Sequence, residues 1–225
     1  MTNLAIIPAR GGSTRLKGKA IYPLGGKPLI HWTINAALNA DVFDKILLSS
    51  DSDKILSTGK MGGVTLHKRA SKYATTEIPV LELILSIAEE YAGKFDTITY
   101  ILPTCPFVKP AQITEGILLL DDKASVVSVV PYSEPIQLAG RVSKNNTFTP
   151  YFSNLSDGKT NSLFMTKYHR PNGAFYMIDT QLLLKNRSFF KSKVKVIIMS
   201  KEESHDINDL FDIKMAELML KEGLI

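Results

Sequence analysis

The sequence predicts an α/β protein with a doubly wound, mainly parallel β-sheet. Short apolar runs, which are typical of strands buried on both faces, alternate along the chain with amphipathic stretches of helical period. This alternation indicates βαβ units, in which a helix crosses the sheet between two parallel strands. The first apolar run leads directly into a glycine-rich loop, as it does in sheets that bind ligands beyond the carboxyl ends of their strands. The predicted architecture is therefore Rossmann-like.

The predicted elements follow one another in a regular order. Continuous runs of β-branched and other apolar residues predict strands at Asn3–Pro8, Lys45–Ser50, Thr97–Leu102, Ala124–Val130, Gly173–Ile178 and Val194–Met199. Apolar residues spaced three and four apart predict helices at Pro28–Asn39, Asp53–Lys60, Ile78–Tyr91, Pro110–Leu120, Thr180–Leu184 and Asp209–Glu222. In the first of these helices, Ile30, Ile34 and Ala37 are assigned to the core.

The regular pattern breaks between Tyr132 and Arg170. Arg141–Phe148 predicts a short strand pair around an asparagine-rich turn, and a polar segment with Gly158 follows it. Such an excursion from the sheet is either a small inserted subdomain, serving as a lid or as a dimerisation contact, or a surface loop without a role. The expected organisation is one domain, 1–225, with an insertion at about 132–170.

Composition limits the class of protein. The 225 residues are 44% hydrophobic and 22% charged, which suits a chain with one sizeable core. The one cysteine, Cys105, excludes an internal disulfide framework and a multi-cysteine zinc site, and a reducing, cytoplasmic location is expected. Neither a signal peptide nor a membrane span is expected, because no apolar run approaches the roughly 20 residues that cross a bilayer.

The net charge of +5 favours an anionic ligand. The basic residues are spread along the chain rather than gathered on one helical face with interleaved aromatic residues, so nucleic acid is not expected as a partner.

The loop after the first strand has the composition of a phosphate site. Its glycines are Gly11, Gly12 and Gly18, and its cations are Arg10, Arg15, Lys17 and Lys19. The glycines are expected to adopt positive φ and to bring backbone N–H groups to an anion, while the cations balance its charge. The spacing of this loop matches neither of two standard phosphate-binding loops. Five residues separate Gly12 from Gly18, where a P-loop has four, and the adjacent Gly11 and Gly12 break the G-x-G-x-x-G register.

An ordered series of motifs covers nearly the whole chain: Ile6–Ser13, Gly25–Ile30, Phe43–Asp51, Leu102–Phe107, Ser128–Val129, Tyr168–Tyr176 and His205–Asn208. Together they resemble the acylneuraminate cytidylyltransferases, which make CMP-linked acidic sugars. The resemblance implies a fold of the nucleotide-diphospho-sugar transferase type. It also implies attack by the anomeric hydroxyl of a 2-keto sugar acid on the α-phosphate of CTP, with release of pyrophosphate.

The motifs resemble different branches of that family. Ser13–Lys19 is similar to the loop of the eight-carbon ketodeoxyoctonate (KDO) enzymes, Thr104–Phe107 to the pseudaminic acid branch, and Arg170–Ala174 to the sialic acid branch. The Gln-Gly-Asp-Glu-Pro segment of the eight-carbon enzymes is absent, so a nine-carbon acid is expected, sialic-, pseudaminic- or legionaminic-like. Sialic acid itself is disfavoured, because Leu102 replaces a glutamine of those enzymes and Asn161–Leu163 replaces their Arg-Arg-Gln segment.

The resemblance implies a nucleotide site around the glycine-rich loop. Its members are Ala9, Arg10, Gly12, Ser13, Arg15, Lys19, Arg69, Thr75 and Thr104. Arg10, Arg15 and Lys19 are assigned to grip the triphosphate and, with Asp206, to be catalytic. From the residues alone, Arg69 equally fits a solvated salt bridge, and Asp51 either caps a helix or contacts the ligand.

The same resemblance implies a sugar site and a metal. Gln137, His169, Arg170 and Asn172 are the candidates for the sugar acid, since amide, imidazole and guanidinium groups suit a polyhydroxylated carboxylate; His169 also reads as a structural histidine. The triphosphate implies Mg²⁺ or Mn²⁺. Asp206 is the leading ligand, Asn208 replaces the family's second aspartate, and Asp209 is a further candidate. Alternatively, Asp206 and Asn208 cap the last helix.

The expected partners are CTP and an acidic keto sugar, and family analogy adds a homodimer built through the insertion. A catalytic role for Cys105 is not expected, because no histidine and asparagine partners are identifiable. Two other classes stay open. One is a nucleotidyltransferase with another base or acceptor, including an eight-carbon KDO-type acid. The other is a sugar-nucleotide-binding relative whose metal site has decayed.

Overall fold

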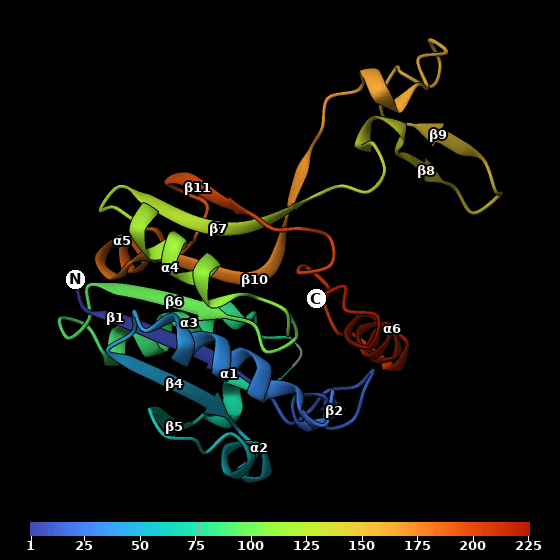
Figure 1. The fold of residues 1–225 in the computed structure, drawn as a ribbon. Coiled ribbons are helices and arrows are strands. Elements are labelled where there is room, and N and C mark those ends of the chain that lie inside the picture. Colours follow the sequence, from blue (N-terminus) through green and yellow to red (C-terminus); the bar gives the residue numbers. More distant parts are fainter. Residues whose placement is uncertain (76) are drawn as a thin grey trace.

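The six predicted apolar runs and one further strand, β5, pair into one seven-stranded sheet in the computed structural model, which describes residues 1–75 and 77–225 (Figure 1). The strand order is β11-β7-β10-β6-β1-β4-β5. Their bounds are β1 Asn3–Pro8, β4 Lys45–Ser50, β5 Val64–Lys68, β6 Thr97–Ile101, β7 Ala124–Pro131, β10 His169–Asp179 and β11 Lys193–Ile198. All neighbours are parallel except β10, which runs antiparallel to β6 and to β7. The predicted α/β class with a mainly parallel sheet is confirmed.

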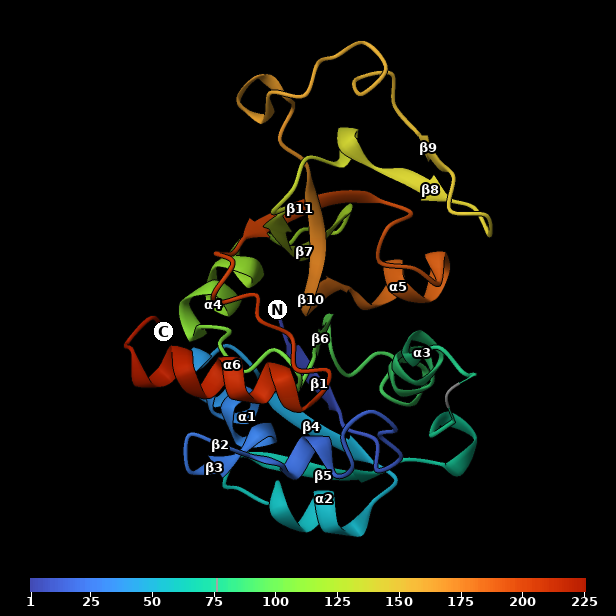
Figure 2. The same cartoon turned by 90° about the vertical axis from the view of Figure 1, so that its right-hand side faces the viewer.

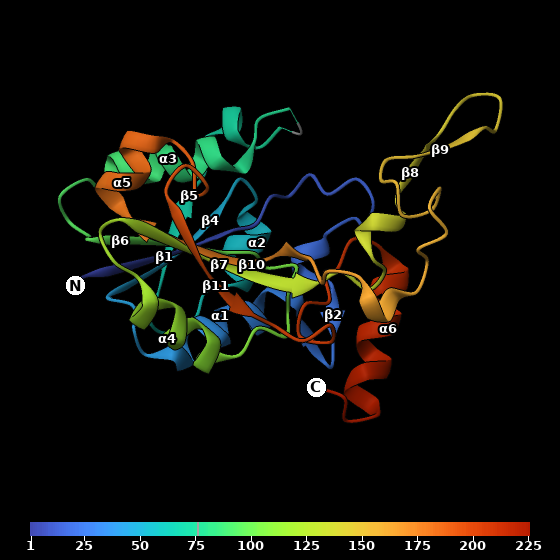
Figure 3. The same cartoon turned by 90° about the horizontal axis from the view of Figure 1, so that it is seen from above.

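Both faces of the sheet are covered, and this explains the continuous apolar strands. On β1, Leu4 and Ile6 point to one face and Ala5 and Ile7 to the other, and all four are fully buried. Helices α3 (Val80–Glu90) and α5 (Thr180–Asn186) cover the first face, while α1 (Leu29–Ala40), α2 (Asp53–Thr58) and α4 (Pro110–Leu119) contribute to the core on the second. Figure 3 shows α3 and α5 on one side of the sheet and α1 and α4 on the other.

The last helix, α6 (Leu210–Lys221), lies apart from these layers. It packs with the hairpin of β2 (Pro23–Leu24) and β3 (Lys27–Pro28) in a separate cluster that includes Leu24, Phe107 and Ile207. This packing brings the carboxyl-terminal segment to the same end of the sheet as the glycine-rich loop. None of the helices in the described ranges is long and apolar enough to cross a membrane.

Two strand predictions were incomplete for the same physical reason. β5 was not predicted, because it is an edge strand in which every residue is at least partly exposed, so its sequence lacks an apolar run. β10 begins at His169, whereas a start at Gly173 was predicted. Its first three residues were missed because they are exposed and pair only with β7, so they do not extend the apolar run.

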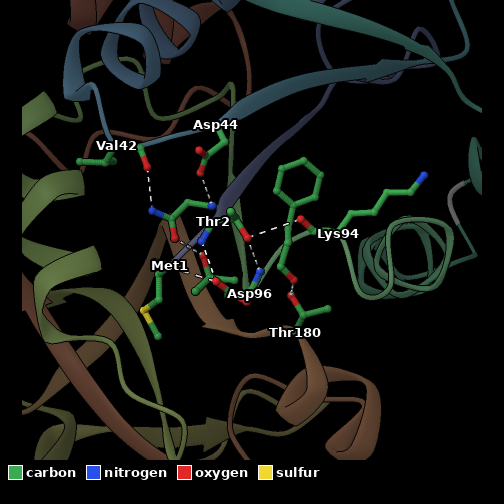
Figure 4. Close-up of polar contacts among 10 residues, drawn as sticks. Met1, Thr2, Val42, Asp44, Lys94, Asp96 and Thr180 are labelled. Atoms are coloured by element: carbon green, nitrogen blue, oxygen red, sulfur yellow. Dashed lines mark hydrogen bonds and ion pairs between the residues drawn. The ribbon is translucent and has the colours of Figure 1, made fainter.

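The amino end of β1 is fastened by side-chain hydrogen bonds (Figure 4). The Asn3 side chain donates from Nδ2 to the Val42 carbonyl at 2.7 Å, and its Oδ1 accepts from the Thr97 hydroxyl at 2.7 Å. The backbone N–H of Thr2 donates to the Asp96 carboxylate at 2.7 Å. Asn3 is 7% exposed and Thr97 fully buried. Asn3 therefore satisfies buried polar groups on both neighbouring segments.

Asn3→Ala is expected to lower the free energy of unfolding by about 1–3 kcal/mol, because it leaves the buried Thr97 hydroxyl without its acceptor. Denaturant unfolding measures the loss. Thr2→Ala is the matched control, since the hydrogen bonds of the Thr2 hydroxyl are exposed, and it should change stability by about 0.5 kcal/mol or less. Equal losses in the two variants would contradict this account.

The segment between β7 and β10 leaves the sheet (Figures 1 and 2). Within it, β8 (Gly140–Val142) and β9 (Phe148–Pro150) form an antiparallel pair, as predicted. Asn146 occupies the connecting turn with a positive φ of 62°, a conformation that asparagine tolerates better than most residues. In both views the pair projects away from the helices that cover the sheet.

Candidate functional site

A cavity of about 390 Å³ opens where β1 and β6 end. Every residue of the predicted nucleotide site except Gly12 lines it: Ala9, Arg10, Ser13, Arg15, Lys19, Arg69, Thr75 and Thr104. Tyr73, Ile78 and Val80 add apolar side chains to the lining. The cavity thus joins a cationic region to an apolar one, at the sheet edge where α/β proteins bind ligands.

The glycine-rich loop is shaped differently from the prediction. Of its three glycines, Gly18 alone has a positive φ, 66°, so the expectation of positive φ at Gly11 and Gly12 was wrong. Gly11 is favoured by close approach instead, because a Cβ there would lie 3.1 Å from Cβ of Ser52, a tight contact that would need Ser52 to shift. The Gly11 N–H donates to the Asp51 carboxylate at 2.9 Å. Ser52, and not Asp51, caps α2, so Asp51 serves to hold the loop against the end of β4.

Lys19 connects the loop to the carboxyl-terminal segment. Its Nζ donates to the carbonyl of Ile207 at 3.0 Å, beside Asp206. Burial lowers the pKa of Lys19, the Asp206 carboxylate raises it, and the guanidinium of Arg15 lowers it further. Two residues assigned as catalytic, Lys19 and Asp206, therefore lie within electrostatic range of each other although they come from opposite ends of the chain.

Arg69 is not the solvated surface arginine that the sequence left open. It is 5% exposed, and its Nη2 donates to the carbonyl of Ser49 at 2.9 Å. Its buried Nε has no hydrogen-bond partner among the described residues. Burial lowers the pKa of Arg69, and Asp51 opposes that shift. Arg69 therefore places a buried, charged guanidinium in the cavity wall, where it suits a polar ligand group.

A second cavity of about 390 Å³ lies on the other side of the 206–208 segment. Its wall contains the predicted residues Arg170, Asn172, Asp206 and Asn208, together with Ser133, Lys201, Ser204 and His205. The two cavities share a boundary, because the N–H of Ile207 donates to the carbonyl of Thr104, which lines the first cavity. Lys201 was not predicted as a site residue. The one indication in the sequence was that a lysine follows the last predicted strand closely.

Two predicted sugar residues line neither cavity. Gln137 is buried in the insertion, where its Nε2 donates to the carbonyl of Thr166 at 2.9 Å. His169 lies exposed at the start of β10, opposite Pro131. Within this chain, the structure brings Arg170 and Asn172 to Asp206, and leaves Gln137 and His169 outside.

The donors around Asp206 fit a cation that arrives with a phosphate ligand. Asp206 accepts from Nδ2 of Asn208 at 2.8 Å, so one carboxylate and one amide stand together. In the described part of the chain, no group of three or more histidine, cysteine or acidic residues is arranged to hold a metal. Mg²⁺ commonly uses one or two carboxylates and takes its other ligands from phosphate and water. This donor set fits that mode, and does not fit a cation held by protein alone.

Asp209 has a different role from the one considered for it. Its carboxylate accepts from the N–H groups of Phe211 and Asp212 and caps α6. Asp209 is therefore the N-cap, and the alternative in which Asp206 and Asn208 cap this helix was wrong.

Cys105 is a buried thiol, as expected for a residue without a nucleophilic role. It is fully buried, and burial together with the nearby Asp206 raises its pKa, which disfavours the thiolate. Its Sγ lies 3.6 Å from the carbonyl of Asn172 and 4.0 Å from Oδ1 of Asp206. The thiol of Cys105 thus packs against the carboxylate of Asp206.

Comparison with known proteins agrees with this arrangement. The family described as Cytidylyltransferase matches residues 4–213. N-acylneuraminate cytidylyltransferase of Escherichia coli is 33% identical over 95% of this chain, and the chain spans 51% of that protein. Pseudaminic acid cytidylyltransferase of Campylobacter jejuni is 27% identical, and CMP-N,N'-diacetyllegionaminic acid synthase of Legionella pneumophila is 30% identical; each match covers 98% of this chain and 97% of the relative.

Among solved structures, a CMP:2-keto-3-deoxy-manno-octonic acid synthetase complexed with CTP superposes with a TM-score of 0.68 at 15% identity. The match covers 99% of this chain and 100% of the other. That likeness supports the fold, and the sequence match over residues 4–213 supports the family. The chain therefore belongs to the cytidylyltransferase family.

Proposed function

We propose that the protein transfers CMP from CTP to the anomeric hydroxyl of a 2-keto-3-deoxy nonulosonic acid and releases pyrophosphate. One observation carries this proposal. Lys19, in the cation-lined first cavity, is hydrogen bonded to the segment that presents Asp206 to the second cavity. A phosphate-binding region thus adjoins a second ligand site across a shared acidic boundary. Three relatives are named for N-acylneuraminate, pseudaminic acid and N,N'-diacetyllegionaminic acid, which supports a nonulosonic acid as the substrate class here.

The first cavity suits CTP in two parts. Arg10, Arg15 and Lys19 would bind the triphosphate, since three cations that line one cavity favour a phosphate ligand. The apolar wall of Tyr73 and Ile78 offers a surface for the base, and the guanidinium of Arg69 lines the same cavity.

The second cavity suits an acidic, hydroxylated sugar. Arg170 and Lys201 provide two cations for the carboxylate, and Ser133 and His205 provide hydrogen-bonding groups for hydroxyls or amides. An acid bound there would place its anomeric hydroxyl near the boundary segment 206–208. Arg170 is the residue we assign to the carboxylate, because a guanidinium binds it in a bidentate manner.

The proposed chemistry is a single displacement at phosphorus. The anomeric oxygen forms a bond to the α-phosphorus, the bond from that phosphorus to the bridging oxygen of pyrophosphate breaks, and the hydroxyl proton is released. Lys19 and Arg15 would stabilise the charge that develops on the departing pyrophosphate. Asp206 and the side-chain oxygen of Asn208 would hold Mg²⁺ or Mn²⁺, which neutralises phosphate charge when bound.

The direct test is a pyrophosphate-release assay with CTP, Mg²⁺ and a panel of eight- and nine-carbon keto acids. We expect release with one nine-carbon acid and with CTP, and not with UTP or ATP. Release with an eight-carbon acid alone, or with another nucleotide, would overturn the proposal in favour of a different transferase. CTP binding without turnover, together with a large gain of activity in Asn208→Asp, would favour a relative whose metal site is impaired.

We also propose a homodimer formed through the insertion, and a cytoplasmic location in keeping with the single free thiol. The insertion exposes large apolar side chains, among them Leu163 at 85% and Phe164 at 88% exposure. Clusters of this kind on a projecting segment favour contact with a second copy. Light scattering should give the mass of a dimer. Phe164→Asp should give a folded monomer, and an unchanged mass in that variant would contradict the proposed surface.

A further inference from the structure

Asn172 lies at an irregular point of β10. Pro171 pairs with Val129 of β7, and the next registered pair joins Tyr176 to Val127, so β10 carries extra residues that form a bulge. Gly173, within it, has a φ of 84°, which favours glycine. The bulge turns the side chain of Asn172 inward, where it is 6% exposed.

The amide of Asn172 is fully engaged within the protein. Its Oδ1 accepts from the hydroxyl of Ser128 at 2.6 Å and from the N–H of Ala174 at 3.1 Å. Its Nδ2 donates to Oγ of Ser204 at 2.8 Å and to Sδ of Met199 at 3.1 Å. A side-chain amide has two donor hydrogens and one oxygen with two lone pairs. No hydrogen-bonding capacity is left for a sugar, although Asn172 borders the second cavity.

The two donor contacts reach the segment that carries Asp206. Ser204 precedes Asp206 by two residues and is 6% exposed. A second route leads to the same carboxylate, because the backbone carbonyl of Asn172 contacts the thiol of Cys105, which lies 4.0 Å from Asp206. The segment from β11 to α6 has no regular secondary structure up to the cap of α6. Its position therefore depends on individual hydrogen bonds, among them the one from Asn172 to Ser204 and the backbone bond from Ile207 to Thr104.

We propose that Asn172 is a positioning residue that places the Asp206 carboxylate by holding Ser204, and is not a contact to the sugar acid. The inference rests on the proposed function, in which Asp206 receives the divalent cation. Groups that hold a metal ligand in place commonly affect metal affinity or activity by about 10–100-fold when removed. The side chain of Asn172 would act in this way on Asp206 through Ser204, whereas the contact of its backbone carbonyl with Cys105 is kept by any residue at this position.

The test separates the two roles by the parameter that changes. In Asn172→Ala, the dissociation constant for Mn²⁺, titrated by electron paramagnetic resonance with CTP present, should rise by about 10–100-fold. KM for the sugar acid should change by less than about twofold, since no contact to the acid is lost. A raised KM for the acid with unchanged Mn²⁺ affinity would overturn the proposal, because a direct sugar contact gives that result.

Ser204→Ala removes the other end of the same hydrogen bond and leaves the contacts of Asn172 with Ser128 and Ala174 in place. It should reproduce the loss of Mn²⁺ affinity, and the double variant should be no worse than Asn172→Ala. Additive losses would contradict a shared path. This milder variant also keeps the test available if Asn172→Ala does not fold.

Hydrogen exchange tests the placement without any ligand. The N–H of Ile207 donates to the carbonyl of Thr104 at 2.8 Å, so it reports whether the segment beside Asp206 is held. Exchange at Ile207 should be faster in Asn172→Ala and in Ser204→Ala than in the wild type. Unchanged protection would overturn the inference. Absence of CTP-dependent Mn²⁺ binding in the wild type, with faster exchange in the variants, would instead count against the proposed function alone.

Discussion

Lys19→Met should lower kcat/KM for CTP by about 10²–10³-fold, the usual effect of removing one pre-placed donor from developing phosphate charge. The protein should stay folded, because Lys19 is only partly buried and methionine can occupy a similar volume. The variant loses the cation in the first cavity and the hydrogen bond to the carbonyl of Ile207. Pyrophosphate release at varied CTP measures the activity, and thermal unfolding checks the fold.

Lys17→Met is the matched control for this prediction. It makes the same substitution in the same loop, but Lys17 is exposed and does not line the cavity. Its kcat/KM should stay within about twofold of the wild type, since an exposed charge of this kind is screened by solvent. If both variants lost activity equally, the general charge of the loop would matter and the placement of Lys19 would not.

The pH dependence of kcat/KM for CTP also tests the role of Lys19. Burial lowers the pKa of its ammonium group, so the charge is lost at a lower pH than for an exposed lysine. Because the charged form binds phosphate, kcat/KM for CTP should fall as pH rises through this lowered pKa. Lys19→Arg keeps the charge to higher pH, so in this variant kcat/KM should fall only at a higher pH.

Asp206→Asn should lower kcat/KM by at least about 100-fold and raise the Mg²⁺ concentration needed for half-maximal rate. Among the described residues that line the second cavity, Asp206 is the one carboxylate, and it is held beside Lys19 and Asn208. Without it, the cation would keep only phosphate, water and amide ligands, and the positive charge of Lys19 would lose its counterion. Pyrophosphate release across a Mg²⁺ titration measures both effects.

Asp209→Asn provides the control, three positions along the chain. Asp209 caps α6, and asparagine caps helices about as well as aspartate does. Activity and Mg²⁺ dependence should therefore stay near wild type. A comparable loss in both variants would show that the negative charge of the segment as a whole, and not the carboxylate of Asp206, supports the reaction.

Parts of the fold were predictable because burial leaves a direct mark on composition. β1 is buried on both faces, and its continuous apolar run gave its bounds without error. β5 was not predicted because none of its residues is buried and its sequence has no continuous apolar run, whereas the other edge strand, β11, has one. The same limit applies to β10, whose first residues are exposed. The glycines show a further limit, since Gly11 is favoured by the nearness of Ser52 and not by its own φ.

The candidate site also contains residues that the sequence predicted and residues that only the fold places there. The loop cations Arg10, Arg15 and Lys19 were identified because they are neighbours in sequence, and family motifs added Arg69 and Asp206. The motif containing Asn172 led to a sugar-binding assignment, since a motif records which residue is present and not what its amide contacts. Lys201 was missed because its position beside Arg170 depends on how the segment after β11 folds back.

Residues close together along the chain were enough to predict the α/β class, which is confirmed, and a phosphate site at the first loop, which stays a prediction; both rest on local period and local charge. Folding was needed to show that Lys19 meets Ile207 and that the amide of Asn172 holds Ser204. Those partners are 188 and 32 positions apart. Hydrogen bonds over such separations exist only after the sheet and the last helix have packed, since only packing can place their donors and acceptors within 3 Å.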